Sequence, residues 1–271
     1  MGSYFKQTFA VQSEEKFNVS SEERKTRRSI YLLPNLITTL SMFLGFLAMV
    51  WAAQGFFVKA SLAILVSALL DGLDGKVARL THTASEFGVQ YDSLADAVAF
   101  GIAPAMLILQ WQLLQFGNLG VAASFIYVAC GVLRLARFNI TTGMSSKRFF
   151  VGLPIPAGGC TLVTFVLFAS TLPDFFGYVI PWLTLFLGIF IGILMVSRVR
   201  YFSFKEYDFL RAHPIRCLVV FILLLSLLCT APKIFSFVFC LLYIVSGLLY
   251  TYVLLPRRDR QLMRALTPKR P

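Results

Sequence analysis

Apolar stretches long enough to cross a bilayer recur along almost the whole chain. Hydrophobic residues make up 58% of its 271 residues and charged residues 14%, which is typical of a polytopic membrane protein and not of a soluble globule. Reading windows of about 20 apolar residues predicts spans near 33–54, 57–79, 88–113, 118–138, 154–172, 177–196, 215–231 and 234–255. We therefore expect an all-α membrane protein of about eight transmembrane helices, six in a core and two added at the C-terminus.

The basic residues are distributed as membrane orientation requires. The net charge is +12, yet 23 of the 25 Lys and Arg residues fall on one side if the N-terminus is cytoplasmic, leaving only Lys59 and Lys233 on the other. This is the positive-inside pattern, and it argues against nucleic-acid binding. The remaining basic excess suits anionic lipid headgroups. We expect a protein of the cell (inner) membrane with both termini in the cytoplasm.

The chain divides into four predicted parts. A cytoplasmic segment, 1–31, includes a charged and mildly amphipathic stretch at 11–30 that favours a helix on the membrane surface. A membrane core follows over 32–200. Two further transmembrane helices occupy 201–255, and a basic cytoplasmic tail covers 256–271.

Four aspartates stand inside these apolar stretches. At the centre of a spanning helix, four charged Asp side chains would cost on the order of 10 kcal/mol on the insertion scale. They belong to a pattern that reads D-x-x-D-G-x-x-A-R, eight residues, then G-x-x-x-D-x-x-x-D. Its members are Asp71, Asp74, Gly75, Ala78, Arg79, Gly88, Asp92 and Asp96.

The spacing of the pattern indicates what compensates the charge. Positions 71, 74, 75 and 78 share one helix face, and 88, 92 and 96 share a face of the next helix. Residues Thr83 to Glu86 resemble a capping box that starts the second helix. Such a hairpin directs four carboxylates into one small volume, an arrangement that a hard divalent cation, or a pair of them, would stabilise.

The smaller residues of the pattern suit a phosphate ligand. Gly75 leaves a bare patch where a bulky anion can approach, and Ala78 keeps the same face open one turn later. Arg79 supplies a cation for a phosphate oxygen. Carboxylates, a divalent metal, small residues and an arginine together indicate a diphosphate site.

The pattern resembles, at every defining position, the signature of the CDP-alcohol phosphotransferases. These integral membrane enzymes displace CMP from a CDP-linked alcohol with a second alcohol. Further segments look like the phosphatidylserine synthase branch of that family, namely 92–105, 133–139, 152–157 and 197–205.

The resemblance implies a role for each residue of the pattern. Asp71, Asp74 and Asp92 would hold Mg²⁺ or Mn²⁺, as a pair of ions, with Asp96 sharing one ion and acting as the general base. CDP-diacylglycerol would be bound through its diphosphate and nucleotide by Gly75, Ala78, Arg79, Gly88, Asn35 and Thr38.

The implied reaction transfers the phosphatidyl group from CDP-diacylglycerol to L-serine and releases CMP. Four cations near the cytoplasmic ends of spans are candidates for the serine carboxylate: Arg134, Arg137, Arg198 and Lys205. Arg134 and Arg137 are predicted to be the most inward-facing of them. The expected partners are the two substrates and membrane lipids, with a homodimer as a further expectation.

Two alternatives remain open. The chemistry could serve another acceptor, such as glycerol 3-phosphate, an inositol phosphate or choline. A transporter coupled to ions or protons could also use intramembrane acids. All four acids lie on one hairpin, however, and the later spans carry no acidic path across the membrane.

Overall fold

A computed structural model describes residues 34–80, 85–141, 149–202, 222–223 and 226–254. The predicted surface helix at 11–30, Thr83, Lys205, the basic tail and most of the predicted span at 215–231 lie outside these residues. The side chains of Ala78 and Arg79 are likewise outside the description, although both residues belong to a described helix.

The described residues form a bundle of helices with one small strand pair. A first helix, Pro34–Ala53, is followed by α2 (Phe57–Leu80), α3 (Glu86–Asp96), the π-helix η1 (Ala97–Ile102), α4 (Ala103–Trp111) and the 3₁₀ turn η2 (Leu113–Phe116). The chain continues through α5 (Asn118–Thr141), β1 (Phe149–Val151), α6 (Ile155–Ala169), the 3₁₀ turn η3 (Asp174–Tyr178) and α7 (Ile180–Val196). It ends with β2 (Arg200–Phe202), α10 (Pro232–Leu249) and the π-helical turn η4 (Tyr250–Leu254).

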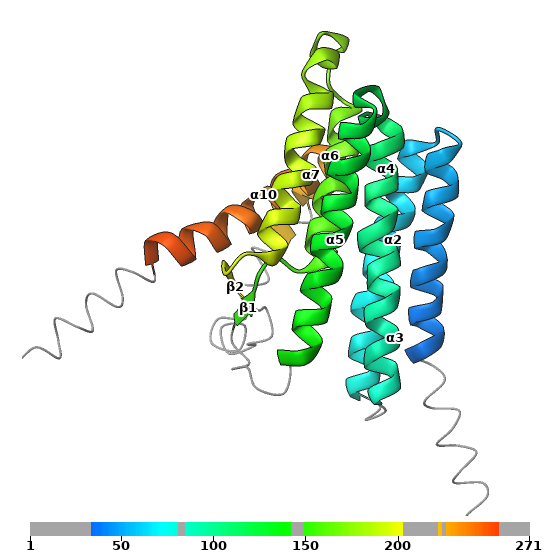
Figure 1. The fold of residues 1–271 in the computed structure, drawn as a ribbon, viewed down its shortest axis with the longest axis vertical. Coiled ribbons are helices and arrows are strands. Elements are labelled where there is room, and N and C mark those ends of the chain that lie inside the picture. The colour runs from blue at the N-terminus through cyan, green and yellow to red at the C-terminus, as the bar shows by residue number, and fades with distance from the viewer. Residues whose placement is uncertain (1–33, 81–84, 142–148, 203–221, 224–225, 255–271) are drawn as a thin grey trace, which may run out of the picture.

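The predicted all-α membrane architecture is confirmed. Seven of the eight predicted spans coincide with described helices. Four of these helices, the first helix, Glu86–Trp111, Asn118–Ile140 and Pro232–Val253, are long and apolar enough to cross a membrane, and α6 and α7 are shorter apolar helices. Figure 1 shows the first helix, α2, α3–α4 and α5 side by side, with α10 crossing the bundle at a steep angle.

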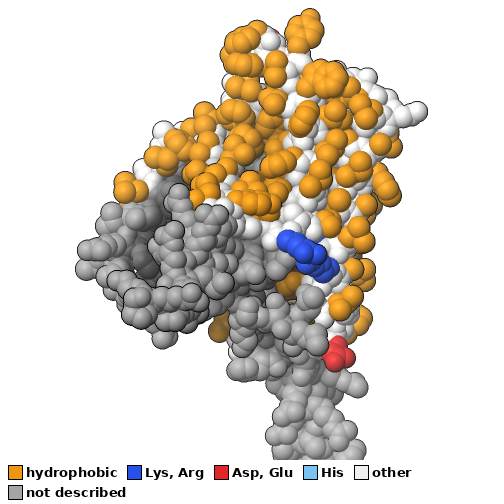
Figure 2. Space-filling view, turned by 60° about the vertical axis from the view of Figure 1, so that its left-hand side comes forward, with side chains coloured by type: hydrophobic (Ala, Val, Ile, Leu, Met, Phe, Trp, Pro, Cys, Tyr) orange, Lys and Arg blue, Asp and Glu red, His pale blue; other side chains and the backbone are white. Residues whose placement is uncertain are grey.

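The outer surface matches a lipid environment. Large apolar side chains, among them Phe43, Phe125 and Phe186, are more than half exposed. In Figure 2, apolar side chains cover the upper part of the face, and the charged side chains visible among the described residues lie toward its lower end. Because lipid tails solvate such a surface, exposed apolar side chains carry no penalty there.

Small residues let the helices approach η1 closely. A Cβ added to Gly45 of the first helix would lie 2.7 Å from the Cα atom of Ala99. One added to Gly159 of α6 would lie 3.1 Å from the carbonyl oxygen of Phe100. Helix packing in membranes relies on such small residues, because apolar burial supplies little drive between helices there.

The π-helix η1 interrupts a span that was predicted as a uniform helix. Pro104 follows it and has no N–H group to donate to a carbonyl of the preceding turn. The Tyr127 hydroxyl donates a hydrogen bond of 2.8 Å to the carbonyl oxygen of Phe100 instead. The irregular turn begins directly after Asp96, and π-turns of this kind are frequent at functional sites.

The two strands form an antiparallel ribbon that the sequence did not predict. Phe149 pairs with Phe202, and Phe150 pairs with Tyr201. Gly152, with a φ of 83°, continues the ribbon by donating from its N–H to the carbonyl oxygen of Val199 at 2.8 Å. The ribbon therefore ties the start of α6 to the end of α7 (Figure 1).

Candidate active site

Three aspartates from two helices converge on one point. Asp71 and Asp74 come from α2 and Asp92 from α3, and each offers a carboxylate oxygen within 4.8 Å of the others. Asp71 and Asp92 are partly buried, and Asp74 is only 4% exposed. The predicted convergence of the two helix faces is therefore observed for these three residues.

Asp96 lies beside this cluster, one turn beyond Asp92. Its carboxyl group is in hydrogen-bonding contact with that of Asp71 and interacts electrostatically with Asp92. The guanidinium group of Arg134 also acts on it electrostatically. Asp96 thus stands between the acidic cluster and a buried cation.

The residues of the cluster fit a divalent metal ion. The Oδ1 atom of Asp92 is buried and has no hydrogen-bond partner among the described residues. Three carboxylates this close repel one another unless a cation neutralises them, and Mg²⁺ and Mn²⁺ prefer such oxygen ligands. The geometry supports metal binding without selecting the ion.

A hydroxyl group from the first helix holds one carboxylate in place. The buried Thr38 donates from Oγ1 to Oδ2 of Asp74 at 2.8 Å. Close by, the Ser41 and Ser67 side chains bond to each other at 2.8 Å and to each other's backbone carbonyls. These contacts fix the first helix against α2 and so fix the orientation of Asp74.

The start of α3 differs from the predicted capping box. Ser85 is the N-cap, and its Oγ accepts a hydrogen bond of 3.0 Å from the N–H of Gly88. The capping prediction for Thr83 and Glu86 was wrong in register because Glu86 occupies the first helical position. A Ser two residues later satisfies the free N–H equally well.

Two of the residues predicted to bind CDP-diacylglycerol, Asn35 and Gly88, meet at this helix start. A Cβ on Gly88 would lie 3.2 Å from Ser85 Oγ and 3.5 Å from Asn35 Oδ1, so the first helix approaches α3 here. Gly75 faces open space, with no atom within 4 Å of an added Cβ among the described residues. The bare patch predicted at Gly75 is therefore present.

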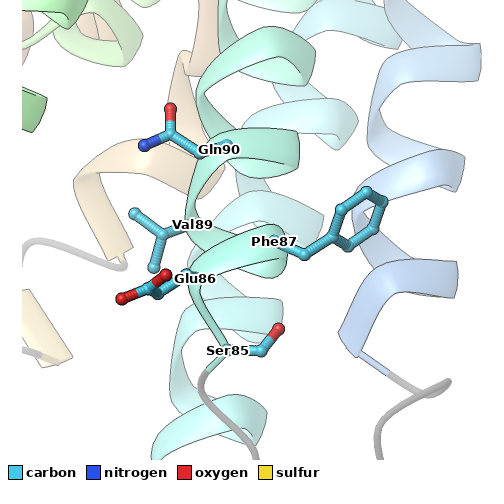
Figure 3. A pocket seen from close by; sticks show the side chains of 5 residues that line it. All are labelled: Ser85, Glu86, Phe87, Val89 and Gln90. Carbon is cyan, nitrogen blue, oxygen red and sulfur yellow. The ribbon is translucent and has the colours of Figure 1, made fainter.

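An open hollow of about 620 Å³ lies beside the first two turns of α3. It is lined by Ser85, Glu86, Phe87, Val89 and Gln90. Figure 3 shows Phe87 pointing toward the first helix, whereas Glu86, Val89 and Gln90 point the other way. None of the four aspartates lines the hollow, so it is a neighbour of the acidic cluster and not its cavity.

The four cations predicted to bind the serine carboxylate differ in how deeply they are buried, as far as the structure describes them. Arg134 is only 8% exposed, and its guanidinium carbon lies 5.3 Å from the centre of the Phe138 ring. Arg137 is exposed and donates from Nη1 to the carbonyl oxygen of Val196 at 3.5 Å. The inward position predicted for both arginines is therefore found for Arg134 only, because Arg137, one turn further along α5, has an exposed side chain. Arg198 is exposed, and Lys205 lies outside the described residues.

Sequence reasoning gave no role to Asn139, which connects α5 to α3. Its amide nitrogen donates to Gln90 Oε1 at 3.3 Å and to Ser93 Oγ at 3.1 Å. Its Oδ1 lies 3.2 Å from the Ser93 hydroxyl. Ser93 directly follows Asp92, so this network fixes the helix that carries two of the acids. Asn139 belongs to the segment 133–139, which resembles the phosphatidylserine synthase branch, and that resemblance was the sign in the sequence that this residue has a role.

Helices with an apolar outer surface and converging intramembrane carboxylates define a polytopic membrane protein with an acidic, metal-compatible site. Residues 31–190, more than half of the chain, match the CDP-alcohol phosphatidyltransferase family. The chain belongs to this family. Its members act on CDP-alcohol substrates with an alcohol acceptor in a lipid environment, and the family uses divalent metals.

Curated relatives cover more of the chain than the family match does. A Helicobacter pylori protein named CDP-diacylglycerol–serine O-phosphatidyltransferase is 40% identical over 222 residues, which are 81% of this chain and 91% of the relative. A Methanocaldococcus jannaschii protein with the same name is 33% identical over 223 residues, 82% of this chain and 95% of the relative. An archaetidylserine synthase from Methanothermobacter thermautotrophicus is 34% identical over 175 residues, 64% of this chain and 70% of the relative. The first two matches cover 222 and 223 residues, which is more than the 190 residues up to the end of the family match. Both therefore extend past residue 190.

Proposed function

We propose that this protein transfers the phosphatidyl group from CDP-diacylglycerol to L-serine, giving phosphatidylserine and CMP. The observation that carries the proposal is the convergence of Asp71, Asp74 and Asp92 within 4.8 Å, on the signature of the family to which the chain belongs. The acceptor is inferred from the names of relatives that share 33–40% identity over four fifths of the chain.

Asp71, Asp74 and Asp92 would hold Mg²⁺ or Mn²⁺, and Asp96 is close enough to share an ion of a pair. When bound, the metal neutralises charge on the diphosphate oxygens and makes CMP a better leaving group. Thr38 keeps the Asp74 carboxylate oriented for this task through its hydrogen bond.

Asp96 acts as the general base in this proposal. The serine hydroxyl oxygen attacks the phosphorus atom nearer the diacylglycerol, forming the new P–O bond. The bond from that phosphorus to the oxygen of CMP breaks, and the hydroxyl proton passes to the Asp96 carboxylate. Phosphoryl transfer needs mainly positioning and charge neutralisation. A bound metal would supply the neutralisation, and the Asp96 carboxylate, in contact with Asp71, would position the hydroxyl group and take its proton.

The CDP-diacylglycerol site follows the first helix and α2. We assign the diphosphate to Gly75, where the structure leaves open space, together with Ala78 and Arg79. Asn35 and Thr38 lie one turn apart on the first helix, and Asn35 approaches Gly88, so these three residues form the nucleotide side. The acyl chains remain in the bilayer between helices.

The serine carboxylate is assigned to Arg134. It is the buried cation among the candidates that the structure describes, and it acts electrostatically on Asp96. Only two carbon atoms separate the hydroxyl oxygen of serine from its carboxylate carbon, so base and cation must be near neighbours. Arg137 and Arg198 are more exposed and less suited, because water weakens a charged hydrogen bond.

The site is placed at the cytoplasmic side of the cell membrane. Lys59, near the start of α2, lies at the end of that helix opposite to the acids, as the positive-inside pattern requires. Serine and CMP are water-soluble, so they must enter and leave from this side. The predicted homodimer stays a prediction.

CMP release by purified protein tests the function. CDP-diacylglycerol in detergent micelles is combined with L-serine, glycerol 3-phosphate, an inositol phosphate or choline, with Mg²⁺ or Mn²⁺. We expect release with serine that excess chelator abolishes. Preference for another alcohol would refute the acceptor, and full activity in chelator would refute the metal site.

The role of Arg134 is tested with Arg137 as its matched control. Lys cannot reproduce the two parallel hydrogen bonds of a guanidinium group to a carboxylate. Because a charged hydrogen bond contributes about 1.5–3 kcal/mol, Arg134→Lys should raise the serine KM roughly 10- to 100-fold and leave the CDP-diacylglycerol KM nearly unchanged. Arg137→Lys should change neither KM. Equal effects of the two substitutions would contradict the assignment.

A further inference from the structure

Two tyrosines from beyond residue 190, where the family match ends, form a pair, and one of them, Tyr243, interacts with the buried Arg134. Tyr201 belongs to β2 and Tyr243 to α10. Their rings pack together with centroids 5.5 Å apart and planes at 32°. The segment after the family match therefore contributes aromatic side chains to the neighbourhood of the proposed acceptor site.

Tyr201 is held rigidly in this contact. Its side chain is fully buried, and its ring occupies the space that a side chain at position 247 would need, since an added Cβ would lie 2.9 Å from the Tyr201 Cζ atom. A glycine at 247 is thus required for α10 to seat on the ring. The position of the neighbouring Tyr243 follows from this seating.

Tyr243 connects this aromatic pair to Arg134. Its half-buried phenol group and the Arg134 guanidinium group interact electrostatically. Arg134 in turn acts on Asp96. Side chains from α3, α5, α10 and β2 therefore form one continuous series that leads from the proposed base to the C-terminal part of the chain.

Two buried donor groups in this series lack partners. Arg134 Nε and the Tyr201 hydroxyl are both buried, and neither has a hydrogen-bond partner among the described residues. Burying a donor without an acceptor is costly. A ligand carrying anionic oxygens would relieve this cost at Arg134, whose Nε and Nη groups donate in a fork that matches a carboxylate.

We propose that Tyr243 is a specificity-determining residue that, backed by the Tyr201 ring, completes with Arg134 the pocket for the carboxylate of the amino-acid acceptor. The inference rests on the function proposed above. A phenol hydroxyl donates to a carboxylate oxygen, and an arginine alone would accept any small anion. The segment that supplies β2 and α10 thereby selects the acceptor, whereas the segment common to the family carries the CDP-alcohol chemistry.

The test compares two acceptors that differ only at the carboxylate. CMP release is measured with L-serine and with L-serinamide for the unmodified enzyme and for Tyr243→Phe, which keeps the ring and removes the hydroxyl. We expect the serine KM to rise roughly tenfold in the variant. The CDP-diacylglycerol KM and the kinetic constants for serinamide should stay within about twofold.

Two further variants make the test specific. Tyr252→Phe alters a 69% exposed tyrosine near the end of the same helical segment and should change nothing. Gly247→Ala displaces the Tyr201 ring without adding or removing a polar group and should reproduce the serine-specific loss. Elution from a sizing column and the melting temperature, measured with CDP-diacylglycerol bound, verify that each variant is folded.

The results separate this inference from the function on which it rests. An unmodified enzyme that prefers an acceptor without a carboxylate would overturn both. If the unmodified enzyme uses serine and Tyr243→Phe leaves the serine KM unchanged, the inference alone is overturned. The same holds if Tyr243→Phe weakens serine and serinamide equally, because Tyr243 would then have a structural role only.

Discussion

Replacing Thr38 with valine tests whether the first helix tunes the acidic cluster. The two side chains have nearly the same shape, so the substitution removes a hydroxyl group and little else. Thr38 Oγ1 lies 2.8 Å from Asp74 Oδ2 and 3.0 Å from the carbonyl oxygen of Pro34. One hydroxyl proton serves one acceptor, and the charged carboxylate is the stronger of the two.

The expected size of the effect follows from this bond. A hydrogen bond to a charged group contributes about 1.5–3 kcal/mol, and about 1.4 kcal/mol corresponds to a factor of ten in binding. Loss of the bond frees the Asp74 carboxylate to rotate, so the metal affinity of Thr38→Val should fall roughly 10- to 100-fold. Saturating metal should restore most of the turnover, because Asp74 itself remains.

The assay is CMP release titrated with free Mn²⁺ at saturating serine and CDP-diacylglycerol. The matched control is Thr39→Val, which alters the next residue of the same helix. Thr39 is exposed and bonds to the Tyr91 hydroxyl at 2.8 Å and not to one of the four aspartates. An unchanged Mn²⁺ activation constant in Thr38→Val, or an equal shift in Thr39→Val, would refute the argument.

Three further substitutions test other parts of the structure. Asp92→Asn should abolish turnover and lower the binding of Mn²⁺, measured by its electron paramagnetic resonance signal; retained binding would place the ion elsewhere. Asn139→Leu removes the bonds to Gln90 and Ser93 and should lower turnover more than CDP-diacylglycerol affinity, as steady-state kinetics would show. Tyr127→Phe leaves the Phe100 carbonyl in η1 without its donor and should destabilise the protein by about 1–3 kcal/mol, seen as a lower melting temperature in detergent.

The sequence was sufficient for features that depend on local spacing. Acids three or four residues apart lie on one helix face, so the convergence of Asp71, Asp74 and Asp92 was predictable from the chain. Span positions were predictable for the same reason, because an apolar stretch of given length specifies a spanning helix. The assigned catalytic and binding roles of these residues stay predictions.

Features that depend on contacts between distant segments were not predictable. The π-turn η1 depends on Pro104 and on the Tyr127 hydroxyl group, which lies 27 residues after Phe100, the residue whose carbonyl it bonds. That Arg134 is buried whereas Arg137, one turn later, is exposed depends on which segments cover each turn of α5. The N-cap at Ser85 was missed because Thr83 and Ser85 both suit a helix start, and only the fold decides between them.

The register of the two-stranded ribbon controls how α10, a helix much later in the chain, packs on β2. Pairing of Phe150 with Tyr201 fixes which side of β2 each side chain occupies. Since neighbouring residues of a strand point to opposite sides, a slip of one residue would turn Tyr201 away from α10. A single-residue insertion or deletion next to β2 should therefore act like a change in α10 itself, although α10 begins only at Pro232.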